Sequence, residues 1–341
     1  MKKVLLFLVM TSIILGTSSC TKLPTGDRVS HVTLDKESLV LFVGEEAMLK
    51  PTVHPLTVSQ SVSWQSDNNA VAVVDANGKV RGVSSGSTII RATSVSGGRA
   101  GSCKVTVSSD YIENGVDYGH GIRFAGKVWA PVNCGYEPAN SGKGYITGKY
   151  YQWGRKVGFG CAGEDATGAT SVMQGPVSLE QAKSTDKFII GDSDRLTWLV
   201  GKDPKLWNSG TEDAPAKTEN DPCPSGWRVP TTKELSSLVG VSHNEVETFM
   251  DSQGNRAIRI INKEDGSEIC LPITGYILWN GENIKRTSIE ESYYYSSELT
   301  RNYWHECGTD LEIRYKNGGS HININITRGC ADAYAIRCIA E

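Results

Sequence analysis

Residues 29–108 repeat one pattern, in which short runs of alternating apolar and polar residues are separated by turn-forming pairs such as Asn77-Gly78 and Gly97-Gly98. A period of two places the apolar side chains of a run on one face of a β-strand. Short strands with turns at regular spacing are typical of a β-sandwich, so we predict an all-β sandwich here. The runs cover residues 32–34, 39–43, 47–53, 62–64, 71–74, 88–92 and 103–107.

Several short motifs in this segment resemble the group 2 bacterial immunoglobulin-like domain. The resemblance implies an immunoglobulin-like sandwich that serves as a spacer or adhesion stalk. We expect Trp64 in the sandwich core, and Cys103 buried because it shares a strand face with Val105 and Val107. The motifs are Val43-Gly44-Glu45, Trp64-Gln65-Ser66, Asn77-Gly78-Lys79-Val80, Gly86-Ser87-Thr88-Ile89-Ile90 and Val105-Thr106-Val107.

The first twenty residues have the pattern of an export signal. Lys2 and Lys3 precede an apolar stretch at 4–15, which is too short to span a bilayer, and small residues lead to Cys20. The end of this segment resembles the lipobox of bacterial lipoproteins. We therefore expect a signal peptide at 1–19, acylation of Cys20, a tether at 20–28, and a lipid-anchored protein of the outer membrane that faces the cell surface. The alternative is ordinary signal cleavage near Ser19, which would leave Cys20 as a free thiol.

Aromatic residues mark a second domain. All 13 Tyr lie at or beyond Tyr111, and Trp64 is the one Trp of eight that precedes it, so we place the second domain at 110–341. Ser178, Thr231 and Ser242 each begin a capping-box pattern, which predicts three short helices. Alternating runs predict strands, and helices followed by strands indicate an α+β domain. The expected strands are 121–132, 257–261, 269–271, 293–297, 311–315, 321–326 and 333–339.

One block in this domain is specific. Residues 220–231 read Asn-Asp-Pro-Cys-Pro-Ser-Gly-Trp-Arg-Val-Pro-Thr, and companion motifs occur at 128–133, 150–154, 271–276, 294–297 and 335–338. Together they resemble the Fibrobacter succinogenes major paralogous domain. The resemblance implies a C-type-lectin-like fold in which the first and last strands pair and a long loop region offers a binding surface. It also implies a disulfide between Cys223 and Cys338.

Other chemistry has little support in the sequence. The second domain has seven cysteines, an odd number, which allows at most three internal pairs. No C-x-x-C or H-E-x-x-H spacing suggests a metal, the calcium-lectin triplets are absent from their expected places, and no nucleophile or phosphate-loop motif is complete. We therefore expect no enzyme activity, metal or cofactor. A net charge of −3 gives no reason to propose a nucleic-acid partner. The seven cysteines are Cys134, Cys161, Cys223, Cys270, Cys307, Cys330 and Cys338.

The last third of the chain combines aromatic residues with Asn, Arg and His. Tyr294, Tyr295 and Tyr334 are expected in the core, whereas Asn and exposed aromatics suit an adaptable binding surface. Asn323 and Asn325 alternate with isoleucines and should point outward. We expect a surface lipoprotein that adheres to a glycan or protein; the alternative is an accessory or tip subunit of a pilus or glycan-uptake assembly. The candidate ligand-binding residues are Trp279, Asn280, Arg301, Asn302, Tyr303, Asn323 and Asn325.

Overall fold

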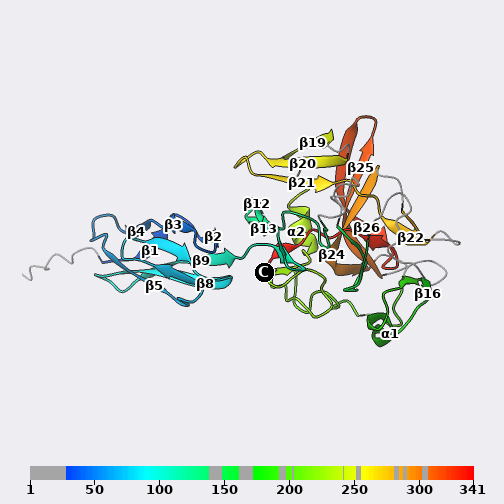
Figure 1. The fold of residues 1–341 in the computed structure, drawn as a ribbon. Coiled ribbons are helices and arrows are strands. Elements are labelled where there is room, and N and C mark those ends of the chain that lie inside the picture. The colour runs from blue at the N-terminus through cyan, green and yellow to red at the C-terminus, as the bar shows by residue number, and fades with distance from the viewer. Residues whose placement is uncertain are drawn as a thin grey trace, which may run out of the picture.

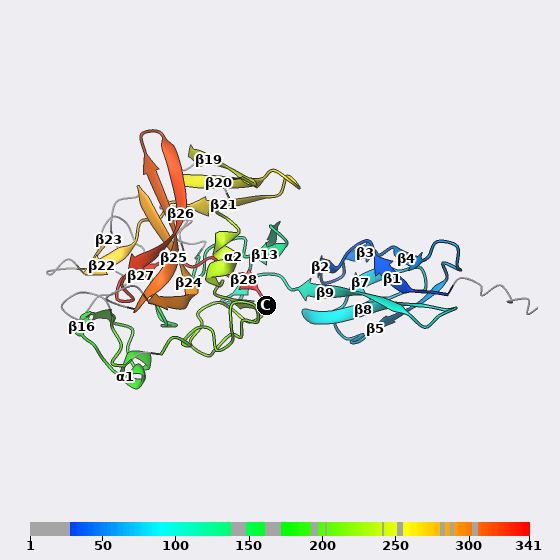
Figure 2. The same cartoon turned by 180° about the vertical axis from the view of Figure 1, so that it is seen from behind.

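The computed structural model describes most of the chain in two lobes joined where β9 ends (Figures 1 and 2). We call the first lobe, β1–β9, the N-terminal sandwich, and the second, β10–β28, the C-terminal region. Cys20 and the predicted signal peptide lie outside the described residues. The described residues are 28–137, 148–160, 172–191, 197–201, 203–240, 242–250, 255–279, 284–286, 290–301 and 306–341.

The N-terminal sandwich consists of short strands, as the alternation predicts. The expected run at 47–53 is divided into β3 and β4, and β7 is an additional strand. The sheet β2-β9-β8-β5 packs against the sheet β3-β7-β6, while β1 pairs with β4. The strands are β1 (His31–Leu34), β2 (Ser38–Phe42), β3 (Glu46–Met48), β4 (Pro51–His54), β5 (Val62–Ser66), β6 (Ala72–Val74), β7 (Lys79–Gly82), β8 (Gly86–Ser94) and β9 (Ala100–Ser108).

Aliphatic side chains from both sheets form the core of the sandwich. Leu41, Ile90 and Val105 of one sheet meet Val80 of the other, and Cys103 is fully buried among them, as expected. The expected core position of Trp64 is only partly right, because its side chain is half-buried and packs against the edge of this core. Its ring lies over Gly78, where an added Cβ would come within 2.6 Å of the ring.

Two strands of the sandwich run in the same direction. β2 and β9 pair in parallel, from Ser38 opposite Lys104 to Phe42 opposite Ser108. Every other pair in the sandwich is antiparallel. The first strand of the larger sheet therefore lies beside the strand that leads into the C-terminal region.

The C-terminal region is mostly β, with less helix than the sequence suggested. Its described helices, α1 (Leu179–Lys183) and α2 (Thr232–Ser236), each have five residues and begin at the predicted capping boxes. The strands are β10 (Ile112–Glu113), β11 (Val116–Asp117), β12 (Ile122–Phe124), β13 (Lys127–Trp129), β14 (Tyr150–Gln152), β15 (Gly158–Phe159), β16 (Val172–Gln174), β17 (Phe188–Ile190), β18 (Trp227–Arg228), β19 (Asn244–Met250), β20 (Arg256–Asn262), β21 (Glu268–Pro272), β22 (Ile277–Trp279), β23 (Ile284–Arg286), β24 (Glu291–Arg301), β25 (Glu306–Lys316), β26 (Gly319–Arg328), β27 (Ala333–Tyr334) and β28 (Ile339–Ala340).

Three local predictions in this region are wrong. The pattern at Ser242 does not begin a helix, because the residues after it form β19 and pair with β20 along its whole length. The expected strand at 121–132 is a hairpin, β12–β13, whose turn places Ala125 and Gly126 at φ of 50° and 70°. Two consecutive residues at positive φ are the signature of a tight hairpin turn. The expected strand at 333–339 is divided into β27 and β28.

The last strand of the C-terminal region lies in one sheet with the early hairpin β12–β13. β13 pairs with β28, with Trp129 opposite Ile339, and β18 lies on the other side of β28. Next to this sheet Cys223 and Cys338 form the disulfide that the family resemblance implied, with an S–S distance of 2.00 Å across a sequence separation of 115. The bond ties the end of the chain to the segment before β18.

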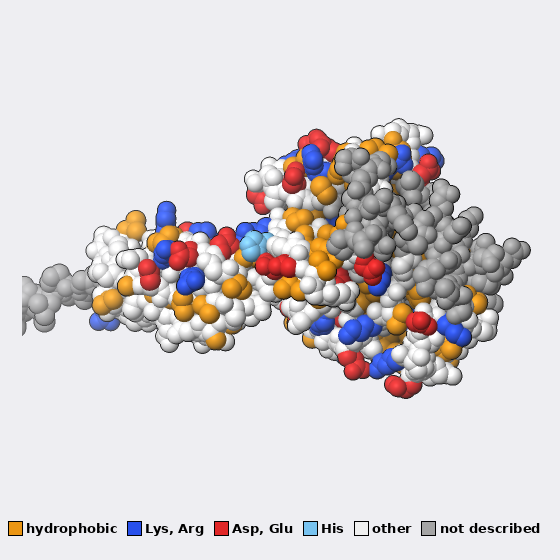
Figure 3. Space-filling model, viewed as in Figure 1, with side chains coloured by type: hydrophobic (Ala, Val, Ile, Leu, Met, Phe, Trp, Pro, Cys, Tyr) orange, Lys and Arg blue, Asp and Glu red, His pale blue; other side chains and the backbone are white. Residues whose placement is uncertain are grey.

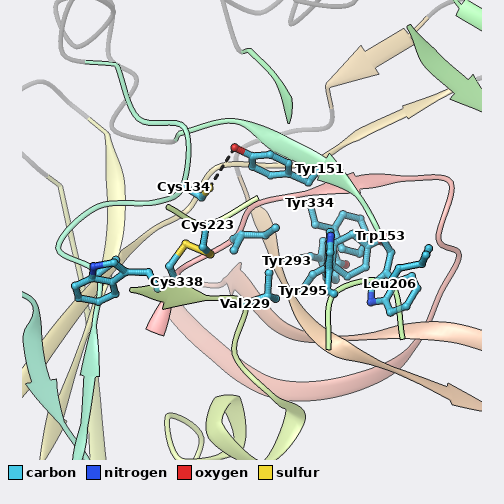
Figure 4. Close-up of a cluster of buried hydrophobic side chains, with 14 of the residues drawn as sticks. Cys134, Tyr151, Trp153, Leu206, Cys223, Val229, Tyr293, Tyr295, Tyr334 and Cys338 are labelled. Carbon is cyan, nitrogen blue, oxygen red and sulfur yellow. Dashed lines mark hydrogen bonds between the residues drawn. A yellow bond between two sulfur atoms is a disulfide. The ribbon is translucent and has the colours of Figure 1, made fainter. Parts of the chain in front are cut away.

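Aromatic rings form much of the core beside this disulfide (Figure 4). Tyr295 stacks on Tyr334 with ring centres 4.4 Å apart. Trp207 packs edge-on against Tyr295, and Trp153 packs against Trp207. Tyr294, Tyr295 and Tyr334 are all buried, as expected. This core lies beneath one end of the sheet β24-β25-β26 and positions the surface described next.

The two lobes also touch at their junction. Phe42, the last residue of β2, packs with the aromatic core of the C-terminal region and stacks on His120 with ring centres 4.5 Å apart. The Arg123 guanidinium lies 4.2 Å from the centre of the Phe42 ring and pairs with Glu45. The sandwich is therefore held against the C-terminal region by side chains as well as by the connecting chain.

Candidate functional site

One face of the sheet β24-β25-β26 carries three cross-strand rows of polar and aromatic side chains. The strand register sets Tyr295, Asp310 and Asn325 in the first row. The second row is Tyr293, Glu312 and Asn323, and the third is Glu291, Arg314 and His321. The opposite face holds alternating residues such as Leu311, Ile313 and Ile324, which pack in the core. Alternation along three consecutive, paired strands therefore assembles these rows.

Side-chain burial decreases across the rows from β24 to β26. The tyrosines on β24 are fully buried, because Tyr276 and Tyr334 pack against them. Glu312 on β25 is 8% exposed. On β26, His321 and Asn323 are exposed and Asn325 is half-buried. We use the name β26 face for His321, Asn323 and Asn325 of β26 together with Arg314 of the neighbouring β25. These side chains are the part of the rows that an external ligand can reach.

Charged side chains lie beside His321 and Asn323 on the same face of the sheet. Glu312 accepts a hydrogen bond from the Tyr293 hydroxyl at 2.9 Å and pairs with Arg314 at 2.6 Å. The same hydroxyl lies 2.8 Å from Glu291. The hydroxyl has one proton to donate, and the positive charge of Arg314 attracts both carboxylates. The hydrogen bond with Tyr293, followed by the charges of Glu312 and Glu291, raises the pKa of Arg314.

This arrangement can offer donors and acceptors at fixed positions. An amide presents both kinds of group, the guanidinium only donates, and the buried carboxylate only accepts. The Tyr293 hydroxyl holds Glu312, and Glu312 holds the Arg314 guanidinium in place before a ligand binds. Arg314 therefore loses little conformational entropy on binding. A hydroxyl-rich or amide-rich ligand matches such a surface.

The structure places the predicted ligand-binding residues only in part. Asn323 points outward as expected, and Asn325 lies on the same face. Trp279 ends β22, which belongs to a different sheet, and Arg301 ends β24 beyond a register shift. The side chains of these two residues, and the whole of Asn280, Asn302 and Tyr303, lie outside the described part. Whether all seven residues form one patch stays a prediction.

Sequence reasoning missed Glu312, Arg314 and His321. A usable signal was present, because Leu311, Ile313 and Tyr315 alternate along β25 and leave positions 312 and 314 on the other face. A second signal was the pair Asn317-Gly318, which is typical of a two-residue hairpin turn and has positive φ at both residues in the structure. Such a turn sets Lys316 opposite Gly319 and therefore Glu312 opposite Asn323, as observed.

Two further features of the described residues have the form of a site. A cavity of about 440 Å³ lies beside α1 and is lined by Leu179, Trp198, Lys156, Lys183 and Glu219 among others. The group of potential metal ligands found among the described residues is Cys134, Cys223 and Cys338. Because the last two are bonded to each other, this group offers one thiol and does not fit a structural zinc site.

The surface shown in Figure 3 mixes acidic and basic side chains over both lobes. This distribution agrees with the small net charge of −3. Among the described residues, no helix has the length and apolar character needed to cross a membrane.

Comparison with known proteins identifies the N-terminal sandwich. Residues 28–105 match the bacterial Ig-like domain (group 2). A 3-O-alpha-D-galactosyl-alpha-L-arabinofuranosidase of Bifidobacterium longum subsp. longum is 41% identical over 92 residues, which is 25% of this chain and 8% of that enzyme. The chain therefore spans a small part of this relative.

Two solved structures show weaker likeness. A mutant intimin of EHEC O157:H7 is 30% identical over 20% of this chain and 34% of its own, with a TM-score of 0.17. A SusE-like surface-located polysaccharide-binding protein from the Bacteroides thetaiotaomicron heparin utilisation locus is 10% identical. It covers 91% of this chain and 33% of its own, also with a TM-score of 0.17.

Proposed function

We propose that this protein is a non-enzymatic lipoprotein of the cell surface, in which the Ig-like sandwich presents a C-terminal domain that binds an extracellular glycan or protein. Acylation of Cys20 would anchor it to the outer membrane. The C-terminal domain is proposed to have a C-type-lectin-like fold of the Fibrobacter major paralogous type. The motif block at 220–231, the pairing of β13 with β28, and the Cys223–Cys338 disulfide support this fold.

The β26 face is the observation that carries the binding proposal. His321 and Asn323 project from a paired strand rather than from a loop, and Arg314 beside them is fixed by Glu312. A site on rigid strands loses little conformational entropy when a ligand binds. The amide and imidazole groups suit the hydroxyls of a sugar or the polar side chains of a protein. Trp279 and Tyr303 would add aromatic contact if they complete the same patch.

The test is to probe arrays of glycans and extracellular proteins with the full chain and with a His321→Ala/Asn323→Ala double variant. We expect the double variant to lose at least about tenfold in affinity, because each lost polar contact removes about 1 kcal/mol. Its melting temperature should not change, since both side chains are exposed. Asn69→Ala, an exposed asparagine of the sandwich, is the matched control and should bind normally.

Two results would redirect the proposal. Unchanged binding by the double variant would exclude the β26 face and leave the cavity beside α1 as the next site to test. Capture of subunits of a bacterial surface assembly, in place of glycans or foreign proteins, would favour an accessory or tip subunit of a pilus or glycan-uptake complex.

A further inference from the structure

Three cysteine sulfurs gather at one point in the core of the C-terminal region. The Sγ atoms of Cys134, Cys223 and Cys338 all lie within 4.8 Å of one another. Cys223 and Cys338 form the disulfide, whereas Cys134 is a thiol. Figure 4 shows Cys134 beside the disulfide, with its hydrogen bond to Tyr151. The Cys134 N–H donates to the Ile336 carbonyl at 2.9 Å, which holds the thiol next to the strand segment that carries Cys338.

A chain of polar groups connects the thiol to the disulfide. The Cys134 Sγ lies 3.4 Å from one carboxylate oxygen of Glu113, and the Tyr111 hydroxyl donates to the other at 3.1 Å. That hydroxyl lies 3.7 Å from the Cys338 Sγ. Glu113 is oriented for this contact because its carboxylate also accepts from the Gly135 N–H. Glu113 therefore lies between the thiol and a proton donor to the far sulfur.

We propose that Cys134 is an internal exchange thiol, which can replace Cys338 as the disulfide partner of Cys223. The protein then has two disulfide isomers, and it interconverts them without an external oxidant or reductant. A thiol placed beside a disulfide is the arrangement that thiol–disulfide exchange requires.

The step is balanced within the cluster. Glu113 accepts the proton of Cys134, and the resulting thiolate attacks the Cys223 sulfur. The Cys134–Cys223 bond forms as the Cys223–Cys338 bond breaks, and the electron pair of that bond leaves on Cys338. Tyr111 protonates the Cys338 thiolate and takes back the proton held by Glu113. One disulfide and one thiol are present before and after the step.

Burial restrains this exchange in the closed fold. It raises the pKa of Cys134, and the negative charge of Glu113 raises it further. Tyr151 lowers that pKa by its hydrogen bond, whereas the charge of Asp221 raises it. Burial also raises the pKa of Glu113, which the nearby Lys149 opposes. Because only the thiolate attacks a disulfide, the Cys223–Cys338 isomer is retained near neutral pH and exchange requires higher pH or local opening.

Exchange would change what the disulfide holds together. In the isomer described by the structure, the bond ties the segment before β28 to the segment before β18. In the other isomer, the bond joins the segments before β14 and β18, and β28 is held by its hydrogen bonds to β13 and β18 and by the packing of Ile339, without a covalent link. The C-terminal strand would then separate from its sheet more easily.

The experiment incubates the full chain at pH 7 and pH 9 without added thiol, then quenches with acid and blocks thiols with N-ethylmaleimide in denaturant. Non-reducing peptide mapping identifies the linked and blocked cysteines. At pH 7 we expect Cys223–Cys338 with label on Cys134. At pH 9 a Cys134–Cys223 peptide with label on Cys338 should form at least about tenfold faster, as the thiolate fraction rises.

Two variants make the test decisive. Cys103→Ala removes a buried thiol of the sandwich, which has no other cysteine, and should leave exchange unchanged. Glu113→Gln keeps Cys134 but removes the proton acceptor, and should slow exchange at a given pH severalfold. The proposal is overturned if the wild-type chain shows only Cys223–Cys338 at pH 9, or if the rate increases with protein concentration, which would indicate exchange between molecules.

Discussion

The N-terminal sandwich and the C-terminal region are both rich in strands and both have an aliphatic core, but the C-terminal region adds other kinds of buried group. The sandwich core consists of Val, Ile, Leu and Ala with the small thiol of Cys103. The C-terminal region has an aliphatic cluster of its own around β20, β21 and β25, and beside it packed Trp and Tyr rings, a disulfide and buried ionic groups such as Arg228 and Glu234. An aliphatic core tolerates the exchange of one aliphatic side chain for another of similar size, because the neighbours repack. A disulfide, a buried ion pair or a ring contact is lost when one of its two members is replaced. The C-terminal region should therefore respond far more sharply to the loss of a single group.

The largest difference is expected when the disulfide is removed. Cys223→Ala/Cys338→Ala should destabilise the C-terminal region by about 4 to 5 kcal/mol, because the bond closes a loop of more than a hundred residues in the unfolded chain. The sandwich should keep its melting temperature. Calorimetry of the full chain measures both, and Trp fluorescence reports mainly the C-terminal region, which holds seven of the eight Trp. Equal loss in both lobes would show that they unfold as one unit.

A second comparison uses two ion pairs of similar geometry. Arg228 and Glu234 are bonded through two contacts of 2.7 Å and are buried, while Arg91 and Asp67 make the same two-point contact on the sandwich surface. Glu234→Gln should cost about 3 kcal/mol, because it leaves the Arg228 charge buried without its partner. Asp67→Asn should leave the unfolding temperature unchanged, since water and salt screen an exposed pair.

The Glu234 pair also predicts a pH dependence. Burial acts to raise the pKa of Glu234, but hydrogen bonds and charge from Arg228 outweigh it and hold the pKa below its ordinary value of 4.5. The folded pKa is therefore the lower one, so this stabilisation is present above pH 4.5 and is lost as the pH falls through the folded pKa. Urea titrations between pH 3 and 7 should show a shallower acid-side slope in Glu234→Gln than in the wild type.

The smallest expected effect tests the sandwich alone. Gly78→Ala would bring a Cβ within 2.6 Å of the Trp64 ring and of the Leu49 carbonyl oxygen, at a φ of +84°. We expect a loss of about 2 kcal/mol in the sandwich only. Gly98→Ala is the control, because Gly98 also has positive φ but nothing within 4 Å of the added Cβ. If the two variants lose equal stability, the backbone conformation alone matters and the ring contact does not.

The same contrast explains what the sequence could and could not predict. Alternation with a period of two is a local property, so it located most strands of the sandwich and the buried position of Cys103. The helix expected at Ser242 failed because four residues of capping pattern could not outweigh pairing between β19 and β20. The Cys223–Cys338 bond was expected through family resemblance alone, since spacing does not determine connectivity. The position of Glu312 beside Asn323 follows from the two-residue turn at Asn317-Gly318, a local signal that sets the register of β25 and β26, whereas the packing of Tyr276 and Tyr334 over β24 depends on contacts between segments distant in the sequence.

The parallel pairing of β2 and β9 has a mechanical consequence. A tether on the N-terminal side and a ligand held by the C-terminal region would pull the start of β2 and the end of β9 in opposite directions. Because the two strands point the same way from Ser38 to Phe42, this load runs along them. Their evenly spaced hydrogen bonds are then sheared together and cannot be unzipped one by one. If the chain is tethered and holds a ligand as proposed, the sandwich should resist this load, and force spectroscopy measures that resistance directly.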